Sequence, residues 1–321
     1  MKPVVAPVPR EQLVAELTKD NLLRRTNNGN NEVYVFDNNS SPLLMQEVGR
    51  VREMTFRHAG GGTGKEIDID DFDTAIEDPQ RQLIVWDPEN LEIVGGYRFY
   101  FLPKGCIDCR IDKLASSSYF NFSDKFLTRY YPHLMELGRS FVHPEYQSRT
   151  MGRKSLYALD NLWDGLGAVI IDNHHIRYLF GKVTMYPHFN PKARNMILYF
   201  LKRHFDDPDN LVTPINPINI DIHKEEMRKL FKRWRRYKEN YKVLSREVRN
   251  LNENIPPLIN AYMNLSPTMR TFGTFINHKF GDVEETGIMI TLRDIYVEKI
   301  NRHLASYKKD FEITWFSHQN Q

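Results

Sequence analysis

The chain has 321 residues, of which 41% are hydrophobic and 26% are charged, and its formal net charge is +3 at pH 7. This length and composition indicate a globular protein with a full hydrophobic core in one large domain or two small ones. The charge is too small to indicate a nucleic-acid-binding protein, and no run approaches the ~20 consecutive apolar residues of a membrane span. We expect a cytoplasmic protein, at most peripheral on the inner face of the membrane, with no nucleic-acid partner.

The N-terminal part of the chain predicts two helices separated by a strand. Leucines at helical spacing predict an amphipathic helix from about Arg10 to Arg25, and Val33–Phe36 reads as a strand. The sequence Ser40-Ser41-Pro42 is a helix start signal, and the helix continues to about His58. It carries Arg52 on an otherwise apolar stripe, so we expect a buried guanidinium with an acidic partner.

A glycine-rich loop and an acidic run follow. The loop Gly60-Gly61-Gly62-Thr63-Gly64-Lys65 differs from a phosphate-binding P-loop, because Ala59 stands where the first glycine is required and Glu66 follows the lysine. We interpret it as a flexible hinge. The run Asp68, Asp70, Asp71 and Asp73 lacks the glycine and glutamate of an EF-hand loop, and taken alone it reads as a solvated loop or as helix caps.

Residues 82–86 and 92–101 predict two strands joined by a turn, and Arg98 places a second guanidinium in an apolar strand. The only cysteines, Cys106 and Cys109, cannot supply a four-ligand zinc site, so we expect reduced thiols and no metal. An aromatic-rich connection spans residues 103–131. Its rings either line an acyl-chain tunnel or pack in the core.

The stretch from Met135 to Arg153 carries the strongest chemical signal. It begins as an apolar strand containing Glu136 and Arg139, breaks at Pro144, and continues as a basic loop before a helix from Ser155 to Leu166. A basic, glycine-containing loop at a helix N-terminus binds phosphate well, because backbone N–H groups and the helix dipole converge there. Glu136 lies a few residues upstream on the strand, at a position suitable for a general base. This layout suits acyl transfer from a phosphopantetheine thioester.

A strongly basic segment dominates the C-terminal half. We expect one long helix from Asp221 to about Leu251, which holds eleven lysines and arginines against four glutamates between Ile222 and Asn250. It either meets an acidic protein, anionic lipid or nucleic acid, or is a solvated helix whose aromatic residues pack on the body. The other predicted elements are a strand at 176–185, a helix at 191–205, a helix at 255–265, a strand pair at 270–279 and 286–292, and a helix at 294–304.

Several short motifs occur in a fixed order along the chain: Arg52 with Phe56 as R-x-x-x-F, Asp70 with Asp73 as D-x-x-D, Gly95-Gly96-Tyr97-Arg98 as G-x-Y-R, and Glu136-Leu137-Gly138-Arg139 as E-L-G-R. Together with the element order, they resemble the GNAT N-acetyltransferase superfamily, in the branch of acyl-homoserine-lactone synthases and ornithine/glycine N-acyltransferases, the latter often labelled hemolysin-like. Leu179-Phe180-Gly181 and the segment 255–262 are similar to the ornithine/glycine side. The resemblance spans roughly residues 33–304.

The resemblance implies an α/β (α+β) GNAT fold, with a mixed central sheet flanked by helices and an inserted basic helix. The domains expected are an N-terminal helical extension (1–30), a GNAT core (31–205), the basic insertion (206–253) and a C-terminal helix and strand pair (254–321). The site residues expected are Glu136 and Arg139 for catalysis, Arg52, Asp70, Asp73 and Arg98 for acceptor binding, and Arg149, Gly152 and Arg153 for the phosphopantetheine phosphate.

The implied reaction is transfer of a long-chain acyl group, with or without a 3-hydroxyl, to the α-amino group of glycine or ornithine, with no bound cofactor and no metal. Lys154 stands where the family's pyrophosphate loop ends in glycine or alanine, which favours acyl carrier protein over coenzyme A as the donor. Partners expected are this carrier protein, the amino acid and an anionic membrane surface. Alternatives are a lactone synthase and a membrane-lytic protein. For Glu136, the alternative role is an ion pair with Arg139 or Arg98.

Overall fold

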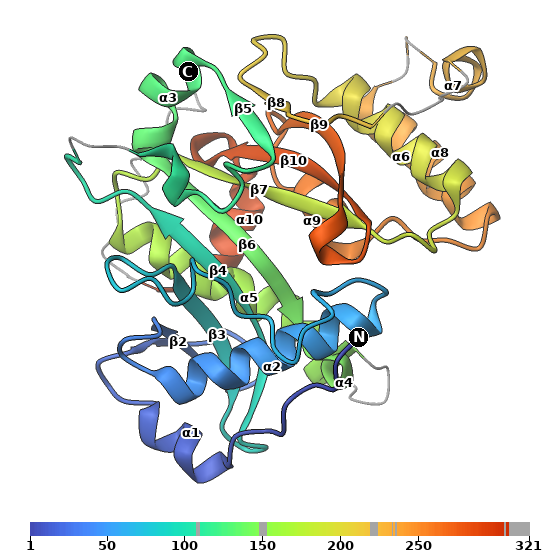
Figure 1. Ribbon diagram of the computed structural model, residues 1–321. Coiled ribbons are helices and arrows are strands. Elements are labelled where there is room, and N and C mark those ends of the chain that lie inside the picture. Colours follow the sequence, from blue (N-terminus) through green and yellow to red (C-terminus); the bar gives the residue numbers. More distant parts are fainter. Residues whose placement is uncertain are drawn as a thin grey trace.

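The computed structural model describes residues 1–106, 110–147, 153–218, 224–232, 234, 236–304, 306 and 307, with side chains from Tyr157 onward in the helix that begins at Arg153. A mixed eight-stranded sheet forms its centre, in the order β1-β2-β3-β4-β6-β7-β10-β9 (Figure 1). Its strands are β1 Leu22–Arg25, β2 Glu32–Phe36, β3 Arg81–Asp87, β4 Glu92–Phe101, β6 Leu134–Val142, β7 Tyr178–Met185, β9 Arg270–Asn277 and β10 Val283–Thr291, and a small second sheet pairs β5 Phe120–Phe122 with β8 Val212–Pro214.

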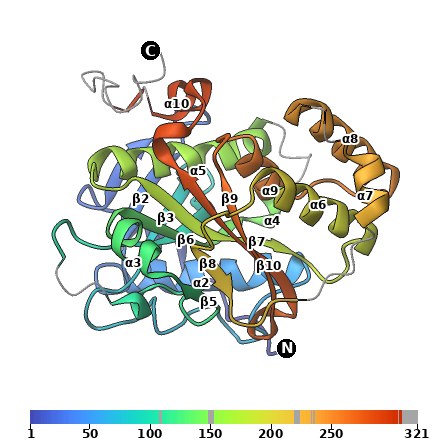
Figure 2. The same cartoon turned by 90° about the horizontal axis from the view of Figure 1, so that it is seen from above.

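Helices cover both faces of the sheet, with α5 and α2 on opposite sides (Figure 2). The first face packs against α5, α6, α8, α9 and α10 in one continuous apolar core. The second face is covered in two parts, by α1 and α2 near β2–β4 and by the small sheet with α3 near β7 and β9. The helix bounds are α1 Arg10–Glu16, α2 Pro42–His58, α3 Asp124–Arg129, α4 Pro144–Gln147, α5 Arg153–Asp172, α6 Pro191–His204, α7 Lys224–Leu230, α8 Tyr237–Asn250, α9 Pro257–Met263 and α10 Val297–His303.

The pair β6–β7 creates an opening in the sheet. These two strands run parallel and pair only from Leu134 with Tyr178 to Leu137 with Gly181. Beyond that point β6 continues to Val142 beside β4, while β7 continues to Met185 beside β10. The backbone groups that the two strands direct toward each other therefore have no strand partner past Leu137, and a gap opens between them.

A bulge in β6 lies directly at this gap. The β4–β6 register shifts so that Arg139 and Ser140 stand opposite Tyr97, and Arg139 adopts a left-handed backbone conformation with φ of 49°. Such a conformation costs a non-glycine residue about 1–2 kcal/mol, and bulges redirect side chains. The two glycines before Tyr97 allow the close approach of the neighbouring strands, because a Cβ on Gly95 would lie 2.5 Å from the Phe141 carbonyl oxygen.

Most predicted strands and helices are confirmed, and two predictions are wrong. The first predicted helix ends at Glu16, because the Asn21 side chain accepts from Thr18 N–H and donates to the Glu16 carbonyl, which closes a turn. The residues that follow form β1, which pairs with β2. The Glu16 carboxylate then caps α2 by accepting from the N–H groups of Leu43 and Leu44 at 3.1 and 2.8 Å.

The basic segment forms two helices in place of one. A new helix begins at Tyr237, where the Glu239 carboxylate accepts from the Arg236 backbone N–H at 2.9 Å. The break directs Phe231 into the core, with its ring beside Phe200. The interpretation that the aromatic residues pack on the body is thus confirmed, except for Trp234, which is 80% exposed.

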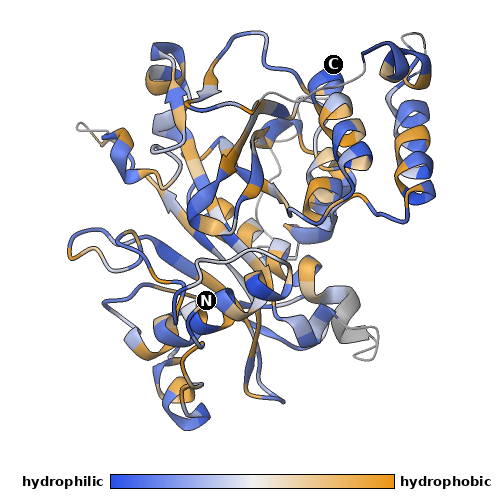
Figure 3. Cartoon of the chain, turned by 45° about the vertical axis from the view of Figure 1, so that its right-hand side comes forward, coloured by the Kyte–Doolittle hydropathy of each residue, from blue (hydrophilic) through white to orange (hydrophobic). Residues whose placement is uncertain are grey.

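The helices carry both apolar and hydrophilic residues, as expected for elements with one face on the sheet (Figure 3). Within the part of the chain that the structure describes, no helix combines the length and the apolar character that crossing a membrane requires.

Candidate active site

A cavity of about 900 Å³ lies at the gap between β6 and β7. On the second face of the sheet it is bounded by Phe56 of α2 and by Ser116 and Tyr119. On the first face it reaches Gln147 of α4 and Ala158 of α5. Since its lining comes from both faces, the cavity passes through the sheet between the two separating strands.

Glu136 lies in the wall of this cavity and is held by the backbone of a neighbouring loop. Its two carboxylate oxygens accept hydrogen bonds from the N–H groups of Ala115 and Ser116 at 2.8 and 2.9 Å. The side chain is buried and lines the cavity. A carboxylate oxygen has two lone pairs, so each oxygen keeps one for a ligand in the cavity. The alternative prediction, an ion pair with Arg139 or Arg98, does not match these contacts, because those arginines pair with aspartates.

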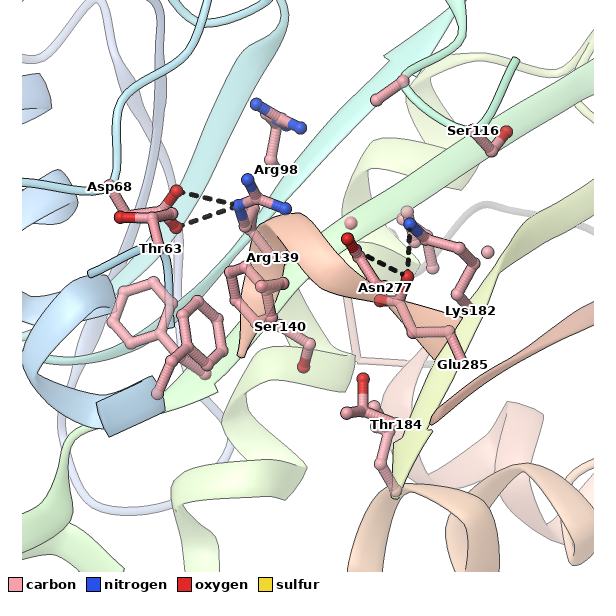
Figure 4. A pocket seen from close by; sticks show the side chains of 18 of the residues that line it. Thr63, Asp68, Arg98, Ser116, Arg139, Ser140, Lys182, Thr184, Asn277 and Glu285 are labelled. Atoms are coloured by element: carbon pink, nitrogen blue, oxygen red, sulfur yellow. Dashed lines mark hydrogen bonds and ion pairs between the residues drawn. The ribbon is translucent and has the colours of Figure 1, made fainter. Parts of the chain in front are cut away.

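Three arginines and three aspartates form a cluster beside Glu136, which we call the arginine–aspartate network. Arg52 contacts Asp68 at 3.0 Å and Asp73 at 3.2 Å, and is fully buried. The other pairs are Arg98 with Asp70 at 2.6 Å and with Asp73 at 3.1 Å, and Arg139 with Asp68 at 2.9 Å and with Asp70 at 3.3 Å. Figure 4 shows Arg139 and Asp68 on one side of the gap. The network is neutral overall and ties the loop after α2 to β4 and β6.

The charges set the ionisation of the buried aspartates. Burial alone raises the pKa of Asp73, but Arg52 and Arg98 outweigh it and hold this pKa below its ordinary value. The pKa of Asp68 is likewise lowered, with burial opposed by Arg139 and Arg52. Both carboxylates therefore stay ionised at neutral pH, and the interpretation of the acidic run as a solvated loop is wrong for these two residues.

A second polar cluster lies across the cavity, which we call the lysine–glutamate cluster. The Lys182 ammonium is 2.8 Å from the Glu285 carboxylate and 4.2 Å from the centre of the Tyr119 ring. Asn277 donates to Glu285 at 3.0 Å, and its side-chain oxygen accepts from the Tyr119 hydroxyl at 3.3 Å. Figure 4 shows this cluster on the opposite side of the site from Arg98 and Arg139, with Ser140 and Thr184 below them in this view.

Residues 51–155 match the family model of an acetyltransferase (GNAT) domain. The glycine N(alpha)-acyltransferases of Bacteroides thetaiotaomicron and Phocaeicola vulgatus are each 52% identical to this chain, cover 96% of it, and are themselves covered over 91% and 94% of their length. The L-ornithine N(alpha)-acyltransferase of Brucella abortus is 27% identical over 76% of this chain and 75% of its own length.

The chain belongs to this family of GNAT N-acyltransferases. The family resemblance, the mixed-sheet GNAT fold and the expectation of an acyltransferase are thereby confirmed.

The acyltransferase brings several of the predicted site residues to one cavity. Glu136, Arg98, Arg139 and Asp70 all line it. Arg52 and Asp73 do not line it, because they are enclosed within the network and hold the lining residues in place.

Arg149 and Gly152, predicted to bind the phosphopantetheine phosphate, lie outside the described residues. Arg153 is the first residue of α5, and its side chain is not among those described. Gln147, which precedes these residues, and Ala158, which follows them, line the cavity. The donor-binding role of the three residues therefore stays a prediction.

Other sequence interpretations have clear outcomes in the acyltransferase. Core packing is confirmed for most rings of the connection 103–131, with only Tyr119 in the cavity wall. Tyr199, on α6, stacks on Phe231 and is not among the residues that line the cavity. The loop 60–65 is tied down, because the Glu53 carboxylate accepts from the N–H groups of Thr63 and Gly64.

Sequence reasoning missed the lysine–glutamate cluster. Lys182 is a charged residue in an apolar strand directly after the Leu179-Phe180-Gly181 motif, which is the same signal that singled out Arg98. Glu285 has a similar setting in β10. A search of both strands for charged residues would have found the two side chains, although not the contact between them.

Proposed function

We propose that this acyltransferase moves a long-chain acyl group from the phosphopantetheine thioester of acyl carrier protein to the α-amino group of glycine, giving an N-acylglycine. Glycine is favoured over ornithine as the acceptor because the relatives at 52% identity are named for glycine, whereas the ornithine enzyme is 27% identical. The observation that supports acyl transfer most strongly is the position of Glu136 in the wall of a cavity that passes between β6 and β7.

The pantetheine arm is proposed to enter from the α4–α5 side and to lie between β6 and β7. His143 N–H donates to the Val94 carbonyl in β4, so by strand alternation the Val142 N–H points away from β4 into the gap. Such a donor can stabilise the oxyanion that forms on the thioester carbonyl. By the same alternation the Phe141 N–H points toward β4 and is not available to a ligand in the gap.

Charge on α7 and α8 supports the carrier protein as donor. Eight described cations of these helices and their connection are exposed, namely Lys224, Arg228, Lys229, Arg236, Lys238, Lys242, Arg246 and Arg249. Carrier proteins are acidic, so this surface is complementary to one. The chain leads from α8 directly to Pro256 and Pro257, which line the cavity, so a carrier docked there is close to the donor entrance.

The reaction requires one proton transfer before bond formation. The acceptor enters as an ammonium ion, and Glu136 takes a proton from it to expose the nitrogen lone pair. The nitrogen attacks the thioester carbonyl, and the C–S bond breaks as the tetrahedral intermediate collapses. The attacking nitrogen loses a second proton as the intermediate collapses, and the thiolate takes up a proton in turn. The products are an N-acyl amino acid and a free pantetheine thiol, and Glu136 returns the first proton to water.

The acceptor is proposed to sit over Gly138. A Cβ at this position would meet no heavy atom within 4 Å, so the space above it is open. Glu136 lies two residues earlier on the same face of β6, and Arg98 is the cross-strand partner of Gly138 in β4. Asp70 lies beside Arg98 and completes this side of the acceptor space.

The Gly138→Ala variant tests this placement. The added methyl group enters empty space and the backbone is not left-handed, so we expect thermal stability within about 2 °C of wild type. The methyl group shortens the acceptor space, and we expect KM for glycine to rise about tenfold with a larger rise for ornithine. Steady-state kinetics with both amino acids measure this, and unchanged KM values for both would place the acceptor elsewhere.

Product analysis tests the function itself. Purified protein is incubated with palmitoyl carrier protein or palmitoyl coenzyme A and a panel of amino acids, and the products are identified by mass spectrometry. We expect N-palmitoylglycine, formed fastest from the carrier protein. Thioester hydrolysis without any N-acyl product would contradict the proposed function, and a lactone formed only with S-adenosylmethionine would favour the synthase alternative.

A further inference from the structure

The lysine–glutamate cluster has no part in the proton transfer or in the binding of the pantetheine arm described above. It nevertheless lines the same cavity, on the wall formed by β7, β9 and β10. Lys182 is the first residue of β7 beyond its pairing with β6, so it stands where the gap begins. Its side chain is 16% exposed and that of Glu285 is 8% exposed, so both charges are largely withdrawn from water.

A buried lysine–glutamate pair is poor evidence for stability, because the desolvation of two ions offsets most of their attraction. Its presence at a cavity wall therefore calls for a functional reason. A cation and an anion side by side complement the two charges of a zwitterion. Amino acids enter the enzyme as zwitterions, so the pair has the electrostatic pattern of an amino-acid binding site.

The cations of the arginine–aspartate network and of the lysine–glutamate cluster differ in how fully neighbouring carboxylates neutralise them. Arg98 contacts two aspartates, and Arg139 contacts two as well. Lys182 contacts one carboxylate, that of Glu285, which is itself shared with the amide of Asn277. The Lys182 ammonium therefore retains more of its charge for a ligand than either guanidinium does.

Strand register places Lys182 next to the acceptor space. Glu136 pairs with Phe180 across the parallel strands, and Lys182 is two residues further along β7 on the same face as Phe180. An acceptor over Gly138 thus has Glu136 on one side and Lys182 on the other. In an α-amino acid a single carbon separates the amine from the carboxylate, so the two groups can face these two side chains at once.

We propose that Lys182 binds the carboxylate of the acceptor amino acid, with Glu285 and Asn277 as positioning residues that hold its ammonium at the cavity wall. This inference rests on the proposed function and deepens it, because it assigns the carboxylate contact to β7 and not to Arg98 or Arg139. It identifies the substrate class as free α-amino acids, in contrast to amines that lack a carboxylate.

The test compares glycine with glycinamide, which keeps the amine and lacks the negative charge. The measured quantity is the ratio of kcat/KM for the two acceptors, with the same acyl donor throughout. We expect wild type to prefer glycine and Lys182→Met to lose on the order of ten- to a hundred-fold of that preference, mainly through KM for glycine. Lys182→Arg keeps the charge and is expected to retain most of the preference.

Two control variants and the choice of a ratio separate a specific loss from general damage. Lys125→Met makes the same change at an exposed lysine on α3, and its ratio should equal that of wild type. The double variant Lys182→Met/Glu285→Gln removes both charges and avoids an unpaired buried carboxylate, and it should show the same loss as the single variant. The ratio compares two acceptors in one sample, so it is independent of the folded fraction.

The outcomes are distinct from those for the proposed function. If wild type forms no N-acylglycine, the proposed function itself fails. If wild type is active and Lys182→Met keeps the wild-type ratio, the inference about Lys182 is overturned while the function stands. The inference would also be overturned if Arg139→Gln lost the preference for glycine while Lys182→Met kept it. The acceptor carboxylate would then bind the arginine–aspartate network.

Discussion

Glu136→Gln is expected to lower kcat with glycine on the order of 10²- to 10⁴-fold, because the amide cannot accept the proton of the acceptor ammonium. Its NH₂ group would also face one of the two N–H donors of Ala115 and Ser116. We therefore expect a loss of stability of about 1–3 kcal/mol. Kinetics well below the melting temperature, normalised to folded protein, measure the catalytic effect alone.

The pH dependence distinguishes a missing base from a distorted site. As pH rises, more of the acceptor loses its proton in solution, so the deficit of Glu136→Gln should narrow toward alkaline pH. A distorted site would give a deficit that is constant with pH. Glu77→Gln, at an exposed position, is the matched control and should behave as wild type. Full activity of Glu136→Gln at neutral pH would rule out the base role.

Asp73→Asn is expected to destabilise the protein by about 3–5 kcal/mol, the usual cost of breaking a buried ion pair from one side. The change leaves Arg52 with Asp68 as its one remaining partner in the network, inside a fully buried setting. Chemical denaturation measures the effect. Asp71→Asn lies two residues away on the exposed side of the same loop, and it should cost less than about 0.5 kcal/mol.

The dependence of the free energy of unfolding on acid pH gives a second test of the arginine–aspartate network. The folded-state pKa of Asp73 is lowered, so its ion pairs contribute their full stability above the unfolded-state pKa of about 3.9 and lose it as the pH falls toward the folded-state value. Wild type should therefore lose stability more steeply below about pH 4 than Asp73→Asn does. Equal acid sensitivity and equal stability of the Asp71 and Asp73 variants would contradict the role of the network.

Local sequence signals were sufficient to predict most helices and strands and the site residues Glu136 and Arg139 on β6. Alternating and apolar runs gave β3, β4, β6 and β7, and the need of a buried guanidinium for a partner followed from Arg52 and Arg98 alone. The resemblance singled out Asp70 and Asp73 through the D-x-x-D motif, but as acceptor-binding residues and not as partners of these arginines. Glu136 was recognised from its place on an apolar strand just before the basic loop and from the E-L-G-R motif.

Contacts between distant segments could not be read from the sequence. The backbone groups that hold Glu136 belong to the irregular loop at Ala115 and Ser116, about twenty residues earlier. Lys182 and Glu285 meet only because β10 adds beside β7, which nothing in either strand specifies. The break before Tyr237 was missed because helical periodicity continues through it, and the burial of Phe231 decides the bend.

A structure with a stable donor analogue tests the central claim most directly. The analogue is a palmitoyl-pantetheine phosphate in which a methylene group replaces the thioester sulfur. The resulting ketone keeps the carbonyl group but cannot transfer its acyl chain. We expect its arm between β6 and β7, its carbonyl oxygen at the Val142 N–H, and its carbonyl carbon facing the space over Gly138 beside Glu136. An arm bound elsewhere on the protein, with the gap between β6 and β7 empty, would contradict the account.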